Sequence, residues 1–225
     1  MTSLRALTLV ILVWMGMAPA LCAGNETPPT PAGKRGRIVV LGDSITAGYG
    51  LTPAQAYPAL LQEKVNAAGF PYDVVNAGVS GDTTAGGLRR VDWALSRGGA
   101  DILVVALGGN DGLRGIQPKQ TASNLTGIVQ KARAKSPGVA VIIAGMQMPT
   151  NMGTQYIEEF RAVFSRVAEE SKAALIPFLL DGVGGVAELN QQDQIHPTAE
   201  GQKRVADNVW PVLEKVLKER AAAVK

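Results

Sequence analysis

Short runs of aliphatic and β-branched residues recur along the chain from residue 37 onward, separated by longer segments. The run Ile38–Leu41 is continuous and is ended by Gly42, which is typical of a strand buried on both faces of a parallel sheet. Four further runs have the same character. They predict strands within 72–77, 102–107, 139–144 and 174–178.

The segments between these runs carry the period of helices. In 57–68, Leu60, Leu61 and Val65 share one face, and 155–172 repeats the pattern. Further helices are expected at 86–95, 117–135 and 198–218. Strands that alternate with helices favour one α/β domain, with a five-stranded parallel sheet, right-handed crossovers and three α/β/α layers.

Residues 1–23 have the pattern of a secretory signal peptide. A single positive charge, Arg5, precedes an apolar stretch, and small residues follow it, including Ala20 and Ala23. The apolar stretch is about a dozen residues long, whereas a membrane span needs roughly 20, so export and cleavage are favoured over a stable membrane anchor. Cleavage after Ala20 and after Ala23 both stay open. Residues 24–36 are rich in Pro, Thr and Gly and are expected to form a flexible linker before a domain at 37–225.

Composition excludes several classes of protein. The 225 residues are 46% hydrophobic and 18% charged, which suits one globular core. The net charge of +3 is too small to favour nucleic acid as a partner. One cysteine and one histidine cannot form a structural zinc site, and neither a metal nor a cofactor is expected. Any hydrolytic mechanism that needs histidine must use His196.

Polar motifs follow the predicted strands. Gly42-Asp43-Ser44 ends the first strand, Ser80-Gly81-Asp82 follows the second, and Gly109-Asn110-Asp111 follows the third. Asp193 and His196 come after the fifth. Ligands of such sheets bind just beyond the carboxyl ends of the strands, so we expect these side chains to gather at one edge.

This set of residue types suits nucleophilic catalysis. A serine hydroxyl needs a neighbouring base, and an imidazole base needs a third group to hold its tautomer. Ser44, His196 and Asp193 can take these three roles. The backbone N–H groups of Ser44 and Gly81 and the side-chain amide of Asn110 can form an oxyanion hole.

The motifs resemble the SGNH (GDSL) hydrolases, and more narrowly their bacterial periplasmic thioesterase I/lysophospholipase L1/arylesterase branch. The resemblance covers about 38–210 and consists of four motifs in family order: 42–50, 76–88, 107–115 and 193–197. It implies a flavodoxin-like fold and a serine hydrolase that cleaves acyl esters or thioesters. It also implies that Ser44 is the nucleophile, Asp193 the acid and His196 the base, with Ser44, Gly81 and Asn110 as oxyanion donors.

Several points stay open at this stage. Val79, Met146 and Met148 are candidate substrate-binding residues, since Val79 and the loop at 146–156 lie where family members differ. Asp43 and Asp111 are expected to support the site rather than react.

A carbohydrate O-deacetylase and a non-catalytic binding module remain alternatives. The glycine run at 182–187 fits a dinucleotide-binding pattern but follows the last strand instead of the first, so no nucleotide site is expected there.

Overall fold

Five parallel strands form one sheet in the order β2-β1-β3-β4-β5. The computed structural model describes residues 35–223, so the expected signal peptide and all but the end of the expected linker lie outside the described residues. The strands are β1 (Gly36–Gly42), β2 (Tyr72–Gly78), β3 (Ile102–Ala106), β4 (Ala140–Ala144) and β5 (Ala174–Ile176). All five predicted strands are confirmed.

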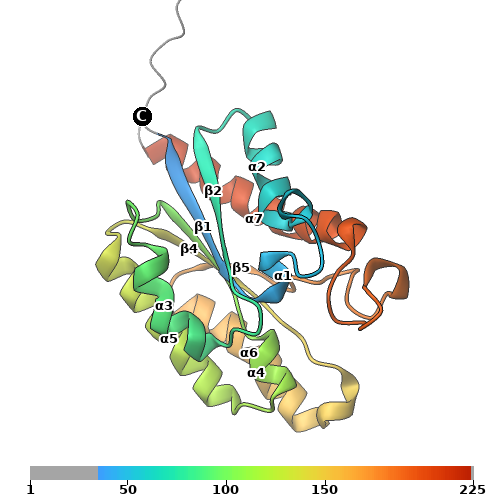
Figure 1. Ribbon diagram of the computed structural model, residues 1–225. Helices are drawn as coiled ribbons and strands as arrows, with labels where there is room; N and C mark the ends of the chain where they lie inside the picture. Colours follow the sequence, from blue (N-terminus) through green and yellow to red (C-terminus); the bar gives the residue numbers. More distant parts are fainter. Residues whose placement is uncertain (1–34, 224–225) are drawn as a thin grey trace, which may run out of the picture. The chain divides into compact units, whose positions relative to one another are not determined.

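Helices cover both faces of this sheet (Figure 1). On one face, α2 (Tyr57–Ala67) packs against α7 (Ala199–Ala223). On the other face, α3 (Thr84–Ala94) packs against α5 (Pro118–Lys135), which packs against α6 (Thr154–Glu170). Each corresponds to a predicted helix, and the three-layer α/β/α fold is confirmed. The short elements are α1 (Ser44–Ala47), α4 (Gly109–Leu113) and 3₁₀ turns at Pro53–Gln55, Thr150–Met152 and Ala187–Leu189.

The continuous apolar runs are explained by the position of their strands. Strands β1 and β3 lie inside the sheet, and Ile38–Leu41 and the whole of β3 are buried. Strand β2 lies at an edge and none of its residues is fully buried. Gly42 is in register with Gly78 and Ala106, so β1, β2 and β3 end at the same level and their loops begin side by side.

Three features of the fold differ from the sequence expectation. Strand β1 begins at Gly36, inside the expected linker, and the Arg35 side chain pairs with Asp73 of β2. Helix α7 continues past 218 to Ala223 and accommodates Pro211 inside it. The short helices α1 and α4 were not expected. Within residues 35–223, no helix is both long enough and apolar enough to cross a membrane.

Candidate active site

Ser44 is the first residue of α1, directly after β1. Asp43 caps this helix, because its Oδ1 accepts the backbone N–H of Ile45 at 3.0 Å. Gln202 of α7 fixes the helix from behind: its Nε2 donates to the carbonyl of Ile45 at 3.0 Å, and its Oε1 accepts the N–H of Tyr57 at 2.8 Å. Ser44 is therefore held on a rigid support while its side chain faces a cleft.

A hydrogen-bonded chain joins Ser44 to His196 and Asp193. The Oγ of Ser44 lies 2.9 Å from Nε2 of His196. On the other side of the ring, Nδ1 lies 2.6 Å from Oδ2 of Asp193. These contacts connect residues 152 positions apart in the sequence. The structure thus brings all three expected triad residues together.

Local hydrogen bonds fix the charge state of Asp193. The backbone N–H of His196, its imidazole and the backbone N–H of Ile195 hold the pKa of Asp193 at about 2. The carboxylate is therefore ionised at neutral pH and can only accept. It follows that Nδ1 of a neutral His196 carries the proton and Nε2 is left to accept the Ser44 hydroxyl.

Tyr49 covers one side of His196. The two ring centroids lie 4.5 Å apart at an interplanar angle of 38°. Gln191 joins the two loops, since its side chain donates to the carbonyl of Tyr49 at 2.7 Å and its backbone N–H donates to the carbonyl of His196 at 2.7 Å. The base is thus held by a tilted aromatic ring as well as by Asp193.

Asp43 is a second carboxyl group at the site, and it is only 2% exposed. Burial raises its pKa to about 6, although its hydrogen bond from Ile45 and the nearby His196 act in the opposite direction. Its capping contact supports the structural role expected for it. The side chain also lines the cleft beside Ser44.

Of the expected oxyanion donors, Ser44 and Asn110 line the cleft, whereas Gly81 is not among the lining residues. Asn110, in α4, lines the cleft, and its Nδ2 donates to the backbone oxygen of Asp82 at 2.9 Å. Gly81, in the loop after β2, has φ +81°, a conformation that L side chains rarely adopt. A Cβ at this position would meet nothing closer than 3.9 Å. The backbone conformation, and not crowding, therefore requires glycine there.

Asp111 connects α4 to the neighbouring helices by hydrogen bonds. It is fully buried, and it accepts from the backbone N–H of Thr84 at 2.8 Å, from the hydroxyl of Thr84 and from the hydroxyl of Thr121 at 3.3 Å. Asn124 donates in turn to the Thr84 hydroxyl at 3.0 Å. This network joins α4 to α3 and α5, so the supporting role expected for Asp111 agrees with its contacts.

The cleft has a volume of about 500 Å³ and is mostly apolar away from the triad. Met146 and Met148 line it, as expected. Val79 is 44% exposed and is not among the lining residues, so its role in substrate binding stays a prediction. Sequence reasoning missed much of the apolar wall: Leu113, Pro149, Phe178, Leu180 and Ile195.

Part of the glycine run at 182–187 lies at the active-site cleft. Gly184 and Gly185 line the cleft, so part of the run borders the space beside the triad. The sequence did hold a signal for this placement: the run lies between the fifth predicted strand and the motif that contains Asp193. Leu113 and Ile195 lie inside the recognised motifs at 107–115 and 193–197.

The chain is similar to known esterases and thioesterases over most of its length. The chain is 48% identical over 180 residues to esterase TesA of Pseudomonas aeruginosa, covering 80% of this chain and 89% of that protein. It is 38% identical over 170 residues to the thioesterase 1/protease 1/lysophospholipase L1 of Escherichia coli K12, covering 76% and 79%. It is 35% identical over 181 residues to an arylesterase of Vibrio mimicus, covering 80% and 90%.

Solved structures of esterases are also similar to this chain. The crystal structure of TesA matches with a TM-score of 0.77 and 47% identity, over 80% of this chain and 99% of that one. Esterase EstA from Pseudoalteromonas, inhibited by monoethylphosphonate, matches with a TM-score of 0.76 and 32% identity, over 81% and 98%. The model of the GDSL-like lipase/acylhydrolase family matches residues 40–204. Because this match spans well over half of the chain, the protein belongs to the GDSL-like lipase/acylhydrolase family.

Proposed function

We propose that this protein is a serine esterase that hydrolyses acyl esters and thioesters through an acyl-enzyme on Ser44. The observation that carries the proposal is the hydrogen-bonded chain from Ser44 Oγ through His196 to Asp193, with distances of 2.9 and 2.6 Å. A binding module would have no use for a base held against a hydroxyl. The related proteins named esterase, thioesterase and arylesterase support the same activity.

In the acylation step, Ser44 Oγ attacks the carbonyl carbon of the substrate while its proton passes to Nε2 of His196. The ionised Asp193 stabilises the imidazolium that results. The tetrahedral intermediate then collapses. Its bond to the alcohol or thiol breaks, the imidazolium returns the proton to the leaving group, and the acyl group stays on Ser44.

In the deacylation step, water takes the place of the leaving group. His196 removes a proton from this water, and the hydroxide attacks the acyl carbon. The imidazolium then protonates Ser44 Oγ as the ester bond to the enzyme breaks, which releases the carboxylic acid. The residues return to their starting states, and no cofactor is needed.

The negative charge on the substrate oxygen needs donors in both steps. The N–H of Ser44 is at the start of α1 and has no acceptor within the helix. An amide nitrogen carries two hydrogens, so Asn110 can donate one to Asp82 and the other into the cleft. Together with the N–H of Gly81, these groups form the proposed oxyanion hole.

The cleft supports a substrate larger than an acetyl ester. Its volume of about 500 Å³ is in the range of small-molecule sites, and its apolar wall, which includes Met146, Met148 and Phe178, suits an acyl chain. We expect kcat/KM to rise from p-nitrophenyl acetate to esters of longer acids. Turnover of the acetyl ester alone would favour an O-deacetylase, and no turnover would favour a binding module.

Covalent labelling tests the proposal itself. An alkyl phosphonate that reacts with activated serines should add to the protein once, and mass spectrometry of peptides should find it on Ser44. The Ser44→Ala variant should take up no label and should lose ester turnover by several orders of magnitude, on the scale of about 10⁶-fold. Label on a different serine in the wild-type protein would refute the assignment of the nucleophile.

We also propose that the protein is exported, on the basis of the signal-peptide pattern in residues 1–23. Expression in a Gram-negative host should give a mature protein in the periplasm or the medium, beginning after Ala20 or Ala23. Edman sequencing of that protein decides between the two cleavage sites. An uncleaved protein in the cytoplasm would contradict export.

A further inference from the structure

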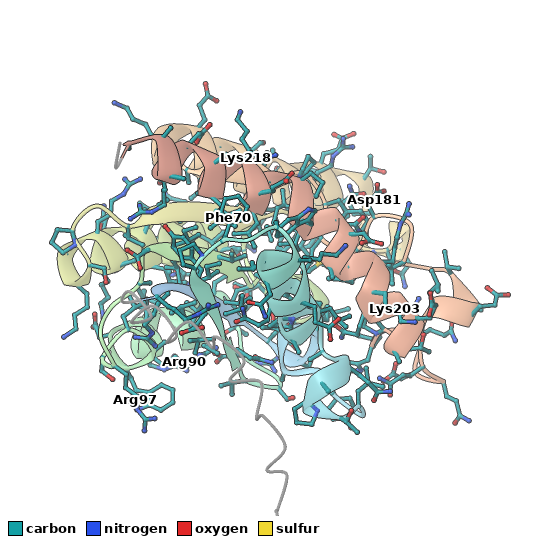
Figure 2. All side chains as sticks on the ribbon, turned by 90° about the horizontal axis from the view of Figure 1, so that it is seen from above. Phe70, Arg90, Arg97, Asp181, Lys203 and Lys218 are labelled. Atoms are coloured by element: carbon teal, nitrogen blue, oxygen red, sulfur yellow. The ribbon has the colours of Figure 1, made fainter. Side chains whose placement is uncertain are left out.

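Arg90 of α3, labelled in Figure 2, makes three hydrogen bonds at the end of the sheet that carries the active site. Its Nε donates to Oδ2 of Asp82 at 2.6 Å, its Nη1 to the carbonyl of Ala77 at 2.8 Å, and its Nη2 to the carbonyl of Gly42 at 2.8 Å. The Arg90 and Asp82 side chains are only 16% and 13% exposed. One guanidinium thus connects three segments of the chain.

Two of these segments carry proposed oxyanion donors. Gly42 is the last residue of β1 and stands two positions before Ser44. Asp82 directly follows Gly81, and its loop is anchored a second time where the N–H of Val79 donates to the carbonyl of Gly42 at 3.0 Å. A change in Arg90 would therefore act on the positions of both backbone donors.

The third proposed donor is connected through Asp82. The side chain of Asn110 donates to the backbone oxygen of Asp82, while the carboxylate of Asp82 pairs with Arg90. The position of Asn110 in the cleft thus depends on a residue that Arg90 holds. Arg90 itself lies outside the residues that line the cleft, so it has no contact with a substrate there.

We propose that Arg90 is the positioning residue that sets the geometry of the oxyanion hole, by fixing the ends of β1 and β2 and the loop of Gly81 and Asp82 in one arrangement. This inference rests on the proposed function. Lysine cannot replace arginine in this role, because a single ammonium group lacks the planar fork that reaches three acceptors in different directions. The positive charge of a lysine at position 90 would preserve only the ion pair with Asp82.

A purely structural role predicts a different outcome. Breaking a buried ion pair lowers stability, but a folded variant would then keep a wild-type oxyanion hole. A positioning role predicts a loss that appears in the transition state, and so in kcat more than in KM. The test must therefore separate folding from catalysis.

The test compares Arg90→Lys with Arg89→Lys, a matched change at the exposed neighbour on the same helix. Thermal melting identifies a temperature at which each variant is folded. With p-nitrophenyl butyrate at that temperature, we expect kcat of Arg90→Lys to fall about 10-fold or more, with KM changed less than about twofold. Arg89→Lys should match the wild type. A folded Arg90→Lys variant with wild-type kcat would overturn the proposal.

A spectroscopic readout reports on the hole directly. Phosphonylation of Ser44 puts a phosphoryl oxygen where the substrate oxyanion would lie, and ³¹P NMR measures its surroundings. The signal should move in the Arg90→Lys adduct and stay at the wild-type position in the Arg89→Lys adduct. An unmoved signal in Arg90→Lys would show that the donors do not depend on Arg90.

Two further measurements test the proposal if the Arg90→Lys variant does not fold. Asp82→Asn removes the ion pair that ties the loop of Gly81 to Arg90 but keeps the backbone oxygen that binds Asn110, and its kcat should also fall, with little change in KM. In the unaltered protein, the Nε–H resonance of Arg90 should shift when Ser44 is phosphonylated, and no shift would count against the proposal. If the wild-type protein is not phosphonylated at all, the proposed function fails, and the role of Arg90 fails with it.

Discussion

Asp193 holds His196 by both of its carboxylate oxygens. Oδ1 accepts the backbone N–H of His196 at 3.0 Å, while Oδ2 lies 2.6 Å from Nδ1 of the same residue. The three-residue spacing between them makes this closed contact possible. One carboxylate therefore fixes the backbone of the base, the tilt of its ring and its tautomer.

Replacement of Asp193 by asparagine should expose this role. An amide can present its NH₂ group to Nδ1, which would place the imidazole proton on Nε2, where it cannot accept from Ser44. We expect kcat of Asp193→Asn to fall by about 10³–10⁴-fold. Steady-state kinetics measures the loss, and ¹⁵N NMR of the single imidazole measures the tautomer. A variant that keeps more than about a tenth of wild-type kcat would contradict this role.

Asn110 should act mainly in the transition state. Replacement by alanine removes the side-chain donor, and we expect kcat to fall by about 10²–10³-fold with a much smaller change in KM. Asn208→Ala serves as the control, since the side-chain amide of Asn208 likewise donates to the backbone, to two carbonyls where Asn110 binds one, but Asn208 belongs to α7 and lies outside the cleft lining. If the Asn110→Ala and Asn208→Ala variants have equal kcat, Asn110 is a structural residue only.

Asp43 should make the stability of the protein depend on pH. Its pKa is about 6 in the folded protein against 3.8 for an ordinary Asp, so the folded state binds this proton more tightly than the unfolded state. The contribution to stability is therefore fully present below about pH 4 and is lost as pH rises through 6. A shift of this size corresponds to about 3 kcal/mol.

The measurement is urea unfolding of the wild type and Asp43→Asn between pH 4 and 7. Asparagine keeps an oxygen for the N–H of Ile45 but cannot ionise. The free energy of unfolding of the wild type, relative to the variant, should fall across this range. Asp193 titrates in the opposite sense and at lower pH, because its depressed pKa gives stability that is lost below about pH 4. A difference that does not vary with pH would rule out an elevated pKa for Asp43.

Sequence was sufficient for the parts of the fold that depend on periodicity and burial. The run Ile38–Leu41 predicts its strand because both faces of β1 are covered by helices. The helices α1 and α4 could not be found in this way, since each is at most five residues long, which is too short to show a helical period. Asp43 caps α1, and Asp111 ties α4 to its neighbours through side chains distant in the sequence.

The residues of the candidate site were also only partly predictable from the sequence. Motif spacing was enough to select Ser44, Asn110 and His196 as members of one cleft. The contacts of Arg90 depend on β1 and β2 being neighbours in the sheet, which no local pattern contains. Val79 was proposed from its place in a motif; it is 44% exposed and is not among the residues that line the cleft, so its role in substrate binding stays a prediction.

The lone histidine allows a direct test of the central claim, that His196 is the base which activates Ser44. NMR of its imidazole across pH 4 to 9 gives one titration curve without interference from other histidines. The acid limb of kcat/KM for a soluble ester should have the same midpoint as this curve, because a protonated Nε2 cannot accept from Ser44. Midpoints that differ by more than about one pH unit, with chemistry shown to be rate-limiting, would contradict the assignment of His196 as the base.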